Sequence, residues 1–322
     1  MCTKWLSVLF VVVAFAAASA PNAHSAGGNE RGIHLVTSHL EDATGSTIGP
    51  DGALYVTHGA TGRISRVDLR TGRSRTFASG LPAAVVGLGG VMDVAFLGKT
   101  AYALVTLVGA DVGGNSVVGI YRIDGPSTST VVADLGAFAL SHPPRTPFDV
   151  PTGLQFALDV YRGGFLVSDG HHNRILRVTL DGDITEFAGF DNIVPTGLAV
   201  AGDRVYCARA GAVPHLPEDG RVLVIHPPAA AAEVAAGASL LVDVELRNRR
   251  ELYALSQGDF PPDGVPAAPA LPDTGRLVRV NWDGTMTVVA KELDRPTSLE
   301  FANGNAYVVT LTGDVWHIDL RS

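Results

Sequence analysis

A four-strand pattern recurs six times along this 322-residue chain and constrains its fold more than any other feature. In each copy an aromatic residue marks the second expected strand, and successive markers lie 41 to 63 residues apart. The markers are Tyr55, Tyr102, Phe165, Tyr206, Tyr253 and Tyr307. An apolar segment precedes each marker, and a third alternating segment such as R-I-L-R-V-T (174–179) follows it. Repeats of this length with four strands each predict an all-β fold, a β-propeller of six four-stranded antiparallel blades.

The sixth copy stops after its third strand, at Asp319. A strand-like segment without a partner, Ile33–His39, stands at the other end of the chain. We therefore expect the N-terminal strand to complete the last blade, because a closed ring leaves no exposed sheet edge. Residues 31–322 would then form a single propeller domain. Two β-sandwich domains are the alternative, which one continuous period disfavours.

The first 26 residues have the pattern of a secretory signal. Lys4 is their only charge, an apolar run covers residues 6–18, and A-A-A-S-A follows. This predicts a signal peptide and leader with cleavage between about residues 18 and 26, and hence a secreted or extracytoplasmic protein. An uncleaved N-terminal anchor is the alternative. No later stretch approaches the ~18 apolar residues of a spanning helix, so we expect no membrane span in the mature chain.

Charge and cysteine content exclude two further classes. The formal net charge is −8, which gives no electrostatic basis for binding nucleic acid. Cys2 belongs to the leader, and Cys207 then has no disulfide partner. Since Cys207 lies in an apolar strand pattern, we expect it to be a small buried hydrophobic residue.

Loop lengths distinguish the two faces of the expected ring. Second-to-third loops and blade connections emerge on one face, which we call the long-loop face; the opposite side is the turn face. The long connections span residues 81–90, 109–116, 136–149, 211–219 and 258–274, whereas 157–164 is the longest on the turn face. Long loops in a compact fold are usually functional, so a small molecule or protein is expected to bind there. The candidate ligand-binding residues in the connections of this face are His171, His172, His215 and Asp259.

Two further candidates, Asp93 and Asp243, share one position of the aligned first strands, in opposed blades 2 and 5. The other blades carry Gly45, Gly153, Gly197 and Ser298 there. Aspartate is disfavoured inside strands, so these residues need a reason. Either they accept hydrogen bonds from backbone N–H groups of neighbouring loops, or they form a ligand- or cation-binding channel mouth on the long-loop face. In the second case Asp93, Asp243, Glu245 and Glu300 would hold Ca²⁺ or another divalent cation.

Other signals are weaker. The adjacent His171 and His172 are a possible metal pair if their turn makes them converge. Four third strands begin with arginine, at Arg63, Arg174, Arg221 and Arg276, and we expect structural pairing with acids such as Asp169. The chain contains no H-E-x-x-H, G-x-S-x-G, G-x-x-x-x-G-K-[ST] or paired C-x-x-C motif, so no catalytic residue is assigned and no cofactor is predicted beyond the weak cation site.

Longer segments resemble known families. D-G-H-H-N-R-I-L-R-V (169–178) is similar to the NHL-type propeller repeat. Segments 89–96, 150–156, 169–174, 191–200, 210–220, 253–260 and 295–301 together resemble the ScyD/ScyE-type family. Those proteins are predicted exported propellers, named after members encoded with the pigment scytonemin. The resemblance implies the fold and export, and it brings no established catalytic residues.

Three functions stay open at this point. The leading hypothesis is a non-enzymatic binding or scaffold propeller that acts through its long-loop face. The alternative is a divalent-metal-dependent lactonase-like hydrolase with its site at the channel mouth, by similarity to six-bladed propeller lactonases. A quinone-cofactor sugar dehydrogenase on the same fold has no supporting residues in the sequence.

Overall fold

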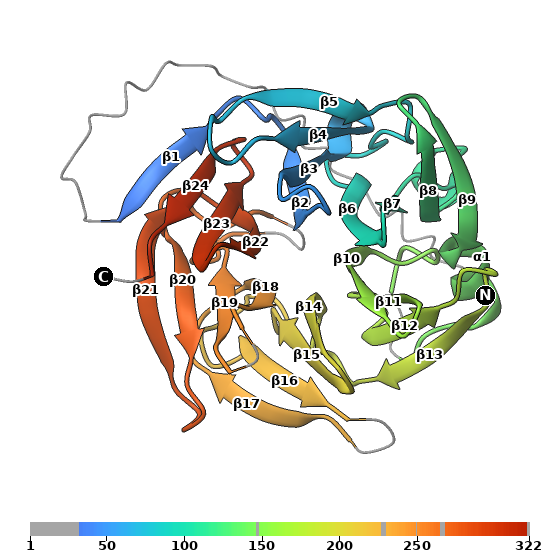
Figure 1. Cartoon of the computed structure of the whole chain (residues 1–322). Helices are drawn as coiled ribbons and strands as arrows, with labels where there is room; N and C mark the ends of the chain where they lie inside the picture. The colour runs from blue at the N-terminus through green and yellow to red at the C-terminus, as the bar shows by residue number, and fades with distance from the viewer. Residues whose placement is uncertain (1–31, 146–147, 227–229, 249, 265–267, 321–322) are drawn as a thin grey trace.

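The computed structural model describes residues 32–145, 148–226, 230–248, 250–264 and 268–320, and the predicted signal peptide lies outside them. The described residues form six four-stranded antiparallel sheets arranged as blades around a common axis (Figure 1). This confirms the predicted six-bladed β-propeller. Within the described residues, no helix is long and apolar enough to cross a membrane.

The blades follow one another along the chain. Blade 1 contains β2 (Ala43–Ile48), β3 (Leu54–His58), β4 (Arg63–Val67) and β5 (Ser74–Ala78); blade 2 contains β6 (Gly90–Leu97), β7 (Thr100–Thr106), β8 (Gly119–Gly125) and β9 (Thr128–Asp134). Blade 3 contains β10 (Gln155–Tyr161), β11 (Gly164–Asp169), β12 (Arg174–Val178) and β13 (Ile184–Gly189); blade 4 contains β14 (Pro195–Ala201), β15 (Arg204–Arg209), β16 (Arg221–Ile225) and β17 (Ala232–Ala236). Blade 5 contains β18 (Leu241–Leu246), β19 (Leu252–Ser256), β20 (Gly275–Val280) and β21 (Met286–Leu293).

Blade 6 joins the two ends of the chain. It contains β22 (Pro296–Ala302), β23 (Asn305–Thr310) and β24 (Val315–Ile318), and β1 (Ile33–Thr37) is its outer strand. β1 pairs antiparallel with β24, from Ile33 opposite Ile318 to Thr37 opposite Val315. The edge of β24 is therefore covered by the N-terminal strand, which limits strand addition by another chain.

Hydrophobic side chains pack mainly between blades. Every residue of β3 and β11 is buried, as expected for second strands enclosed by neighbours on both faces. Aromatic residues meet across the boundaries: Tyr102 of blade 2 lies 4.8 Å from Phe165 of blade 3, and Tyr253 of blade 5 lies 5.2 Å from Phe301 of blade 6 (ring centroids). The fourth strands are largely exposed, as in β9.

A one-residue β-bulge interrupts the pairing of the first and second strands in every blade. In blade 3, for example, the register moves from Gln155 opposite Asp169 to Leu158 opposite Val167. The other five first strands shift by one residue in the same way. A bulge of this kind bends a strand and redirects the side chains beyond it.

The observed bounds of β10 correct two expectations from the sequence. Leu158 pairs with the second strand of blade 3 at the position where Val94 pairs with the second strand of blade 2. The residue before it, Ala157 and not Gly153, is therefore equivalent to Asp93. The connection expected at 157–164 is also much shorter, since β10 continues to Tyr161 and β11 begins at Gly164.

The connection at 136–149 contains a helix that the sequence analysis did not predict. α1 spans Leu135–Ser141, and the side chain of Asp134 accepts a hydrogen bond from the Ala137 N–H (2.7 Å) as its N-cap. Two short 3₁₀ helices, η1 (Gly59–Thr61) and η2 (Ala110–Val112), lie in second-to-third loops of blades 1 and 2.

Candidate functional site

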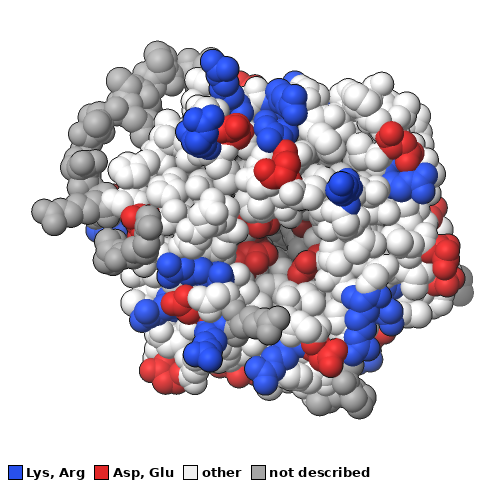
Figure 2. Space-filling view, viewed as in Figure 1, with Lys and Arg blue, Asp and Glu red and all other residues white. Residues whose placement is uncertain are grey.

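The central channel contains a cavity of about 310 Å³ that all six first strands line. Its lining begins in the middle of each first strand and runs toward the turn face. The carboxylates therefore do not lie at the long-loop face, where the channel mouth was expected, because they occupy the middle and later positions of the first strands. Figure 2 shows acidic side chains within the central opening. The acidic residues of this channel cavity are Asp93, Asp159, Asp243, Glu245 and Glu300.

Strand register arranges the channel side chains in two rings. The ring at mid-strand consists of Gly45, Asp93, Ala157, Gly197, Asp243 and Ser298. Each of these residues is either the first one paired beyond the bulge or the residue just before it. Two residues further along, the second ring consists of Thr47, Ala95, Asp159, Ala199, Glu245 and Glu300. Residues two apart on a strand face the same side, so both rings project toward the channel.

Asp93 and Asp243 connect neighbouring blades. Asp93 Oδ1 accepts a hydrogen bond from its own Val94 N–H (2.8 Å), and Oδ2 accepts one from the Leu158 N–H of blade 3 (2.8 Å). Asp243 repeats the arrangement with Val244 (2.8 Å) and with the Leu299 N–H of blade 6 (2.7 Å). The interpretation that these aspartates accept backbone N–H bonds is confirmed, although the donors belong to first strands and not to loops.

Glycine precedes each connecting aspartate in the ring. A side chain at Gly45 would collide with the carboxylate and backbone around Asp93, and one at Gly197 would collide with Asp243. The sequence of the ring is therefore Gly–Asp–small residue, repeated once: Gly45, Asp93, Ala157 and then Gly197, Asp243, Ser298. We call each set of three a latch triplet.

We expect the Asp93→Ala variant to unfold about 1–3 kcal/mol more easily than the unchanged protein at pH 5, because the buried Leu158 N–H loses its acceptor. Alanine fits the position, since Ala157 occupies it in blade 3. Urea titration measures the loss. Asp203→Ala is the control, because Asp203 forms an exposed pair with Arg162 that is worth at most about 1 kcal/mol. Equal losses in the two variants would contradict the latch.

Burial raises the pKa of every carboxyl in the channel cavity. The pKa of Asp159 rises from 3.8 to about 6 and that of Asp243 to about 7, in each case mainly through desolvation. Desolvation also raises the pKa of Asp93, Glu245 and Glu300 well above the ordinary values, and the neighbouring carboxylates add repulsion. The cavity lining contains no Lys, Arg or His to compensate these charges.

The channel carboxylates are weak ligands for one shared ion. Both oxygens of Asp93 and of Asp243 already accept N–H bonds. Among the described residues, no group of three His, Cys, Asp or Glu side chains is close enough to hold a metal ion. Oxygen donors of this kind suit Ca²⁺, but a calcium site needs six to eight such ligands around one point.

The long-loop face carries a separate cluster of aromatic and histidine rings, formed by Phe148, Phe156, His171, His172, His215 and Phe260. We call it the ring cluster. Phe148 stacks on His171 (centroids 4.5 Å apart, planes 10° apart), and Phe156 lies 6.2 Å from the same histidine. His215 meets Phe260 edge-on at 4.9 Å. Phe156 and Phe260 both pack against the apolar group of Val194, Ala210, Leu240 and Ala270, which joins the two halves.

Burial favours the neutral form of two histidines of the ring cluster, His171 and His215. Desolvation lowers the pKa of His171 to about 4, and the nearby His215 contributes to the shift. Desolvation likewise lowers the pKa of His215. The predicted site residues His171, His172 and His215 therefore do come together on one face, but His171 and His172 do not form a metal pair with any third ligand in the described chain.

His172 is held by a buried polar network. Its Nδ1 lies 2.9 Å from Asp169 Oδ2, and because a carboxylate only accepts, Nδ1 carries the proton. Asp169 also accepts from Arg174 Nε (2.9 Å) and Gln155 Nε2 (3.0 Å). Nε2 of His172 is then an acceptor, and it is buried without a hydrogen-bond partner in the described structure.

The remaining candidates have structural partners. Asp259 binds Arg276 through both oxygens (3.0 and 3.2 Å), and Arg174 binds Asp169, so with Arg221 three of the four strand-opening arginines pair with acids in their own blades. Arg221 pairs with Glu233, whereas Arg63 donates to Thr61 Oγ1 (3.1 Å).

Cys207 is fully buried, and burial raises the pKa of its thiol to about 12. His58, another long-loop histidine, is bonded at both nitrogens, to Glu41 O and Ser65 Oγ.

Exposed aliphatic side chains are numerous on the long-loop face. Six of the large hydrophobic residues that are at least 40% exposed lie in its connections: Val85, Val86, Leu140, Val213, Leu216 and Leu271. Val213 and Leu216 flank His215 in the β15–β16 loop. The aromatic members of the ring cluster were missed in the sequence analysis, although Phe148 and Phe260 lie in two of the long connections of that face, at 136–149 and 258–274.

Solved structures with the same fold were found at low sequence identity. A gluconolactonase, XC5397 of Xanthomonas campestris, is 10% identical with a TM-score of 0.62, over 89% of each chain. Regucalcin of Agrobacterium tumefaciens, a calcium-binding protein, is 13% identical with a TM-score of 0.58, over 89% of this chain and 93% of its own. Virginiamycin B lyase of Staphylococcus aureus is 12% identical with a TM-score of 0.55, over 89% and 98%.

These similarities support the fold alone, because identities of 10–13% carry no information about activity. No protein-family model matches the chain, and no curated protein matches it in sequence. The chain is thus a six-bladed β-propeller whose structural relatives include a lyase, a lactonase and a calcium-binding protein.

Proposed function

We propose that this protein is an exported, non-enzymatic propeller that binds a partner protein on its long-loop face. The observation that carries the proposal is the ring cluster, whose stacked rings lie on the face that also carries the exposed aliphatic residues. Exposed apolar side chains that gather on one face are typical of interaction sites. The signal-like N-terminus and the resemblance to the ScyD/ScyE-type family support export.

The chemistry of the face limits what it binds. Neutral histidine and phenylalanine rings favour apolar or aromatic groups, and the exposed Leu140, Val213 and Leu216 extend that surface. We therefore expect a mostly apolar contact.

A double variant, Val213→Ser with Leu216→Ser, tests the proposal. The immobilised propeller is incubated with the exported protein fraction, and the amount of bound partner is measured. The double variant should bind at least ~10-fold less of the partner than the unchanged propeller, because it lacks two exposed apolar side chains worth about 1 kcal/mol each. The control is Val288→Ser with Val289→Ser, which changes the same chemistry on the outer strand β21. Retention of the same partner by both double variants, or loss by both, would refute the assignment to this face.

A second candidate, a lactonase-like hydrolase dependent on a divalent cation, is favoured by the five carboxyls of one cavity. Two observations count against it. Among the described residues no three His, Cys, Asp or Glu side chains are placed to hold one metal ion, and the carboxylate oxygens of Asp93 and Asp243 already accept backbone N–H bonds. Metal analysis of the purified protein, with melting curves in Ca²⁺ and in EDTA, distinguishes this candidate from the binding propeller. Bound metal and lactone hydrolysis that Glu245→Gln abolishes would support this candidate; an unchanged melting temperature without metal would end it.

A further inference from the structure

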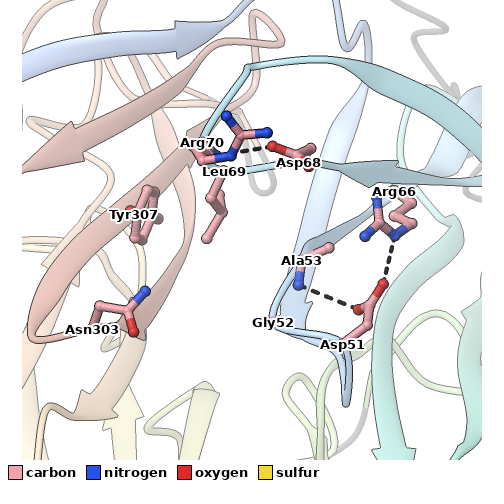
Figure 3. A pocket seen from close by; sticks show the side chains of 9 residues that line it. All are labelled: Asp51, Gly52, Ala53, Arg66, Asp68, Leu69, Arg70, Asn303 and Tyr307. Atoms are coloured by element: carbon pink, nitrogen blue, oxygen red, sulfur yellow. Dashed lines mark hydrogen bonds and ion pairs between the residues drawn. The ribbon is translucent and has the colours of Figure 1, made fainter.

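A second cavity, of about 230 Å³, lies on the turn face at the junction of blades 1 and 6 (Figure 3). The β2–β3 and β4–β5 turns form one side, and the β22–β23 turn with Tyr307 forms the other. We call it the seam pocket, because blade 6 is the blade in which the two ends of the chain pair. Its lining consists of Asp51, Gly52, Ala53, Arg66, Asp68, Leu69, Arg70, Asn303 and Tyr307.

The two carboxylates of the seam pocket are ionised and held in place. Arg66 Nε donates to Asp51 Oδ2 (2.6 Å), and Oδ1 accepts from Tyr55 Oη and the Ala53 N–H (3.3 Å each). Desolvation opposes ionisation of Asp51, but these donors together lower its pKa. Asp68 Oδ1 accepts from the Thr71 hydroxyl and from two turn amides, which lowers its pKa as well. Each carboxylate keeps an oxygen with capacity for a ligand donor.

Three hydrogen-bonding side chains of the pocket have no side-chain partner among the described residues. They are the guanidinium of Arg70, the hydroxyl of Tyr307 and the carboxamide of Asn303. Arg70 is bonded only through its backbone N–H, to Asp68 (3.1 Å). In Figure 3 Leu69 lies between Tyr307 and the Asp51–Ala53 turn, so an apolar side chain and an aromatic ring complete the lining.

This set of groups matches one chemical class. A carboxylate ligand suits the free guanidinium of Arg70, and charge-assisted bonds to guanidinium are the stronger kind. Ligand hydroxyls suit Asp51, Asp68, Asn303 and the Tyr307 hydroxyl, while the C–H face of a sugar suits Tyr307 and Leu69. A bare polyanion is disfavoured, because two ionised aspartates line the same space. We propose that the seam pocket binds a small polyhydroxylated carboxylate of hexuronate size.

Isothermal titration calorimetry with glucuronate tests the proposal on the mature chain. We expect a saturable heat with one site per chain, and at least ~10-fold weaker binding of glucose, which lacks the carboxylate, since a charge-assisted hydrogen bond is worth about 1.5–3 kcal/mol. Acetate and sulfate should bind more weakly than glucuronate. Glucuronate should also raise the melting temperature, because it contacts blades 1 and 6 together.

Arg70→Gln should weaken glucuronate binding by at least ~10-fold, and Tyr307→Phe by a few-fold. Arg75→Gln is the matched control: Arg75 is exposed in β5 of the same blade, lies outside the pocket, and should bind glucuronate as the unchanged chain does. The proposal is overturned if glucuronate gives no saturable heat, if glucose or sulfate binds as tightly, or if a folded Arg70→Gln variant keeps full affinity. Such a failure leaves the long-loop proposal untouched, since the two sites lie on opposite faces.

Discussion

A chain that begins at Ser38, and so lacks β1, is expected to melt at least ~5 °C below a chain that begins at Gly32. β1 provides the backbone partner of β24. It also contributes Ile33 and Val36 to two hydrophobic clusters, and its Val36 carbonyl lies against Gly72 in the β4–β5 turn of blade 1. Loss of these contacts should lower the free energy of unfolding by about 3 kcal/mol or more, which corresponds to roughly that shift in melting temperature for a domain of this size. Melting by circular dichroism measures it.

The chain that begins at Gly32 is the control for this truncation, because it removes the same leader and keeps β1. If the shorter chain does not fold alone, a synthetic peptide of residues 32–37 added in trans should restore a cooperative transition, since β24 then regains its partner. Equal melting temperatures of the two chains, with a monomeric shorter chain, would show that blades 1 and 6 hold the ring without the N-terminal strand.

The second large effect concerns the channel carboxyls and pH. A carboxyl whose pKa is higher in the folded than in the unfolded protein binds more protons when folded, so the free energy of unfolding falls as pH rises. The stabilisation is complete below the ordinary values of 3.8 and 4.5, and it is lost through the raised pKa values of about 6 for Asp159 and about 7 for Asp243. For Asp159 alone the shift corresponds to about 3 kcal/mol.

We therefore expect the melting temperature to fall between pH 5 and pH 8, and the double variant Glu245→Gln with Glu300→Gln to reduce that fall. Glutamine keeps the shape and removes two carboxyls whose pKa values are raised by burial and further by neighbouring carboxylates. The control is Glu218→Gln, in the β15–β16 loop, where the side chain is exposed. A double variant that loses stability at pH 8, or that shows the full fall of the unchanged protein, would contradict this account. Addition of Ca²⁺ at pH 8 separates repulsion from cation binding, because only a bound cation raises the melting temperature of the unchanged chain.

The sequence predicted the architecture because the repeat is strong. Six aromatic markers, the third strands and the turn pairs all have the period of one blade, and the alternation within each strand is clear. The gathering of His171, His172 and His215 on one face also follows from strand order, since their loops leave the blades on the same side.

Register in the first strand of blade 3 could not be predicted. P-T-G-L occurs at both 151–154 and 195–198, so alignment by sequence pattern placed Gly153 level with Asp93, whereas β10 begins only at Gln155 and Ala157 occupies that position. The same error concealed Asp159, which the structure places in one ring with Glu245 and Glu300. Contacts between blades, such as the bond from Leu158 to Asp93, join residues 65 positions apart and leave no local pattern.

The latch triplets have a consequence for how this sequence is able to vary. Gly45 is confined to glycine by the carboxylate of Asp93 and also by the backbone carbonyl of Met92, and Gly197 is confined by the Cα and the carboxylate of Asp243. Because backbone atoms belong to both contacts, a smaller residue in place of the aspartate does not make room for a side chain at the glycine. In related propellers the two aspartates should therefore vary more readily than the glycines that precede them in the ring.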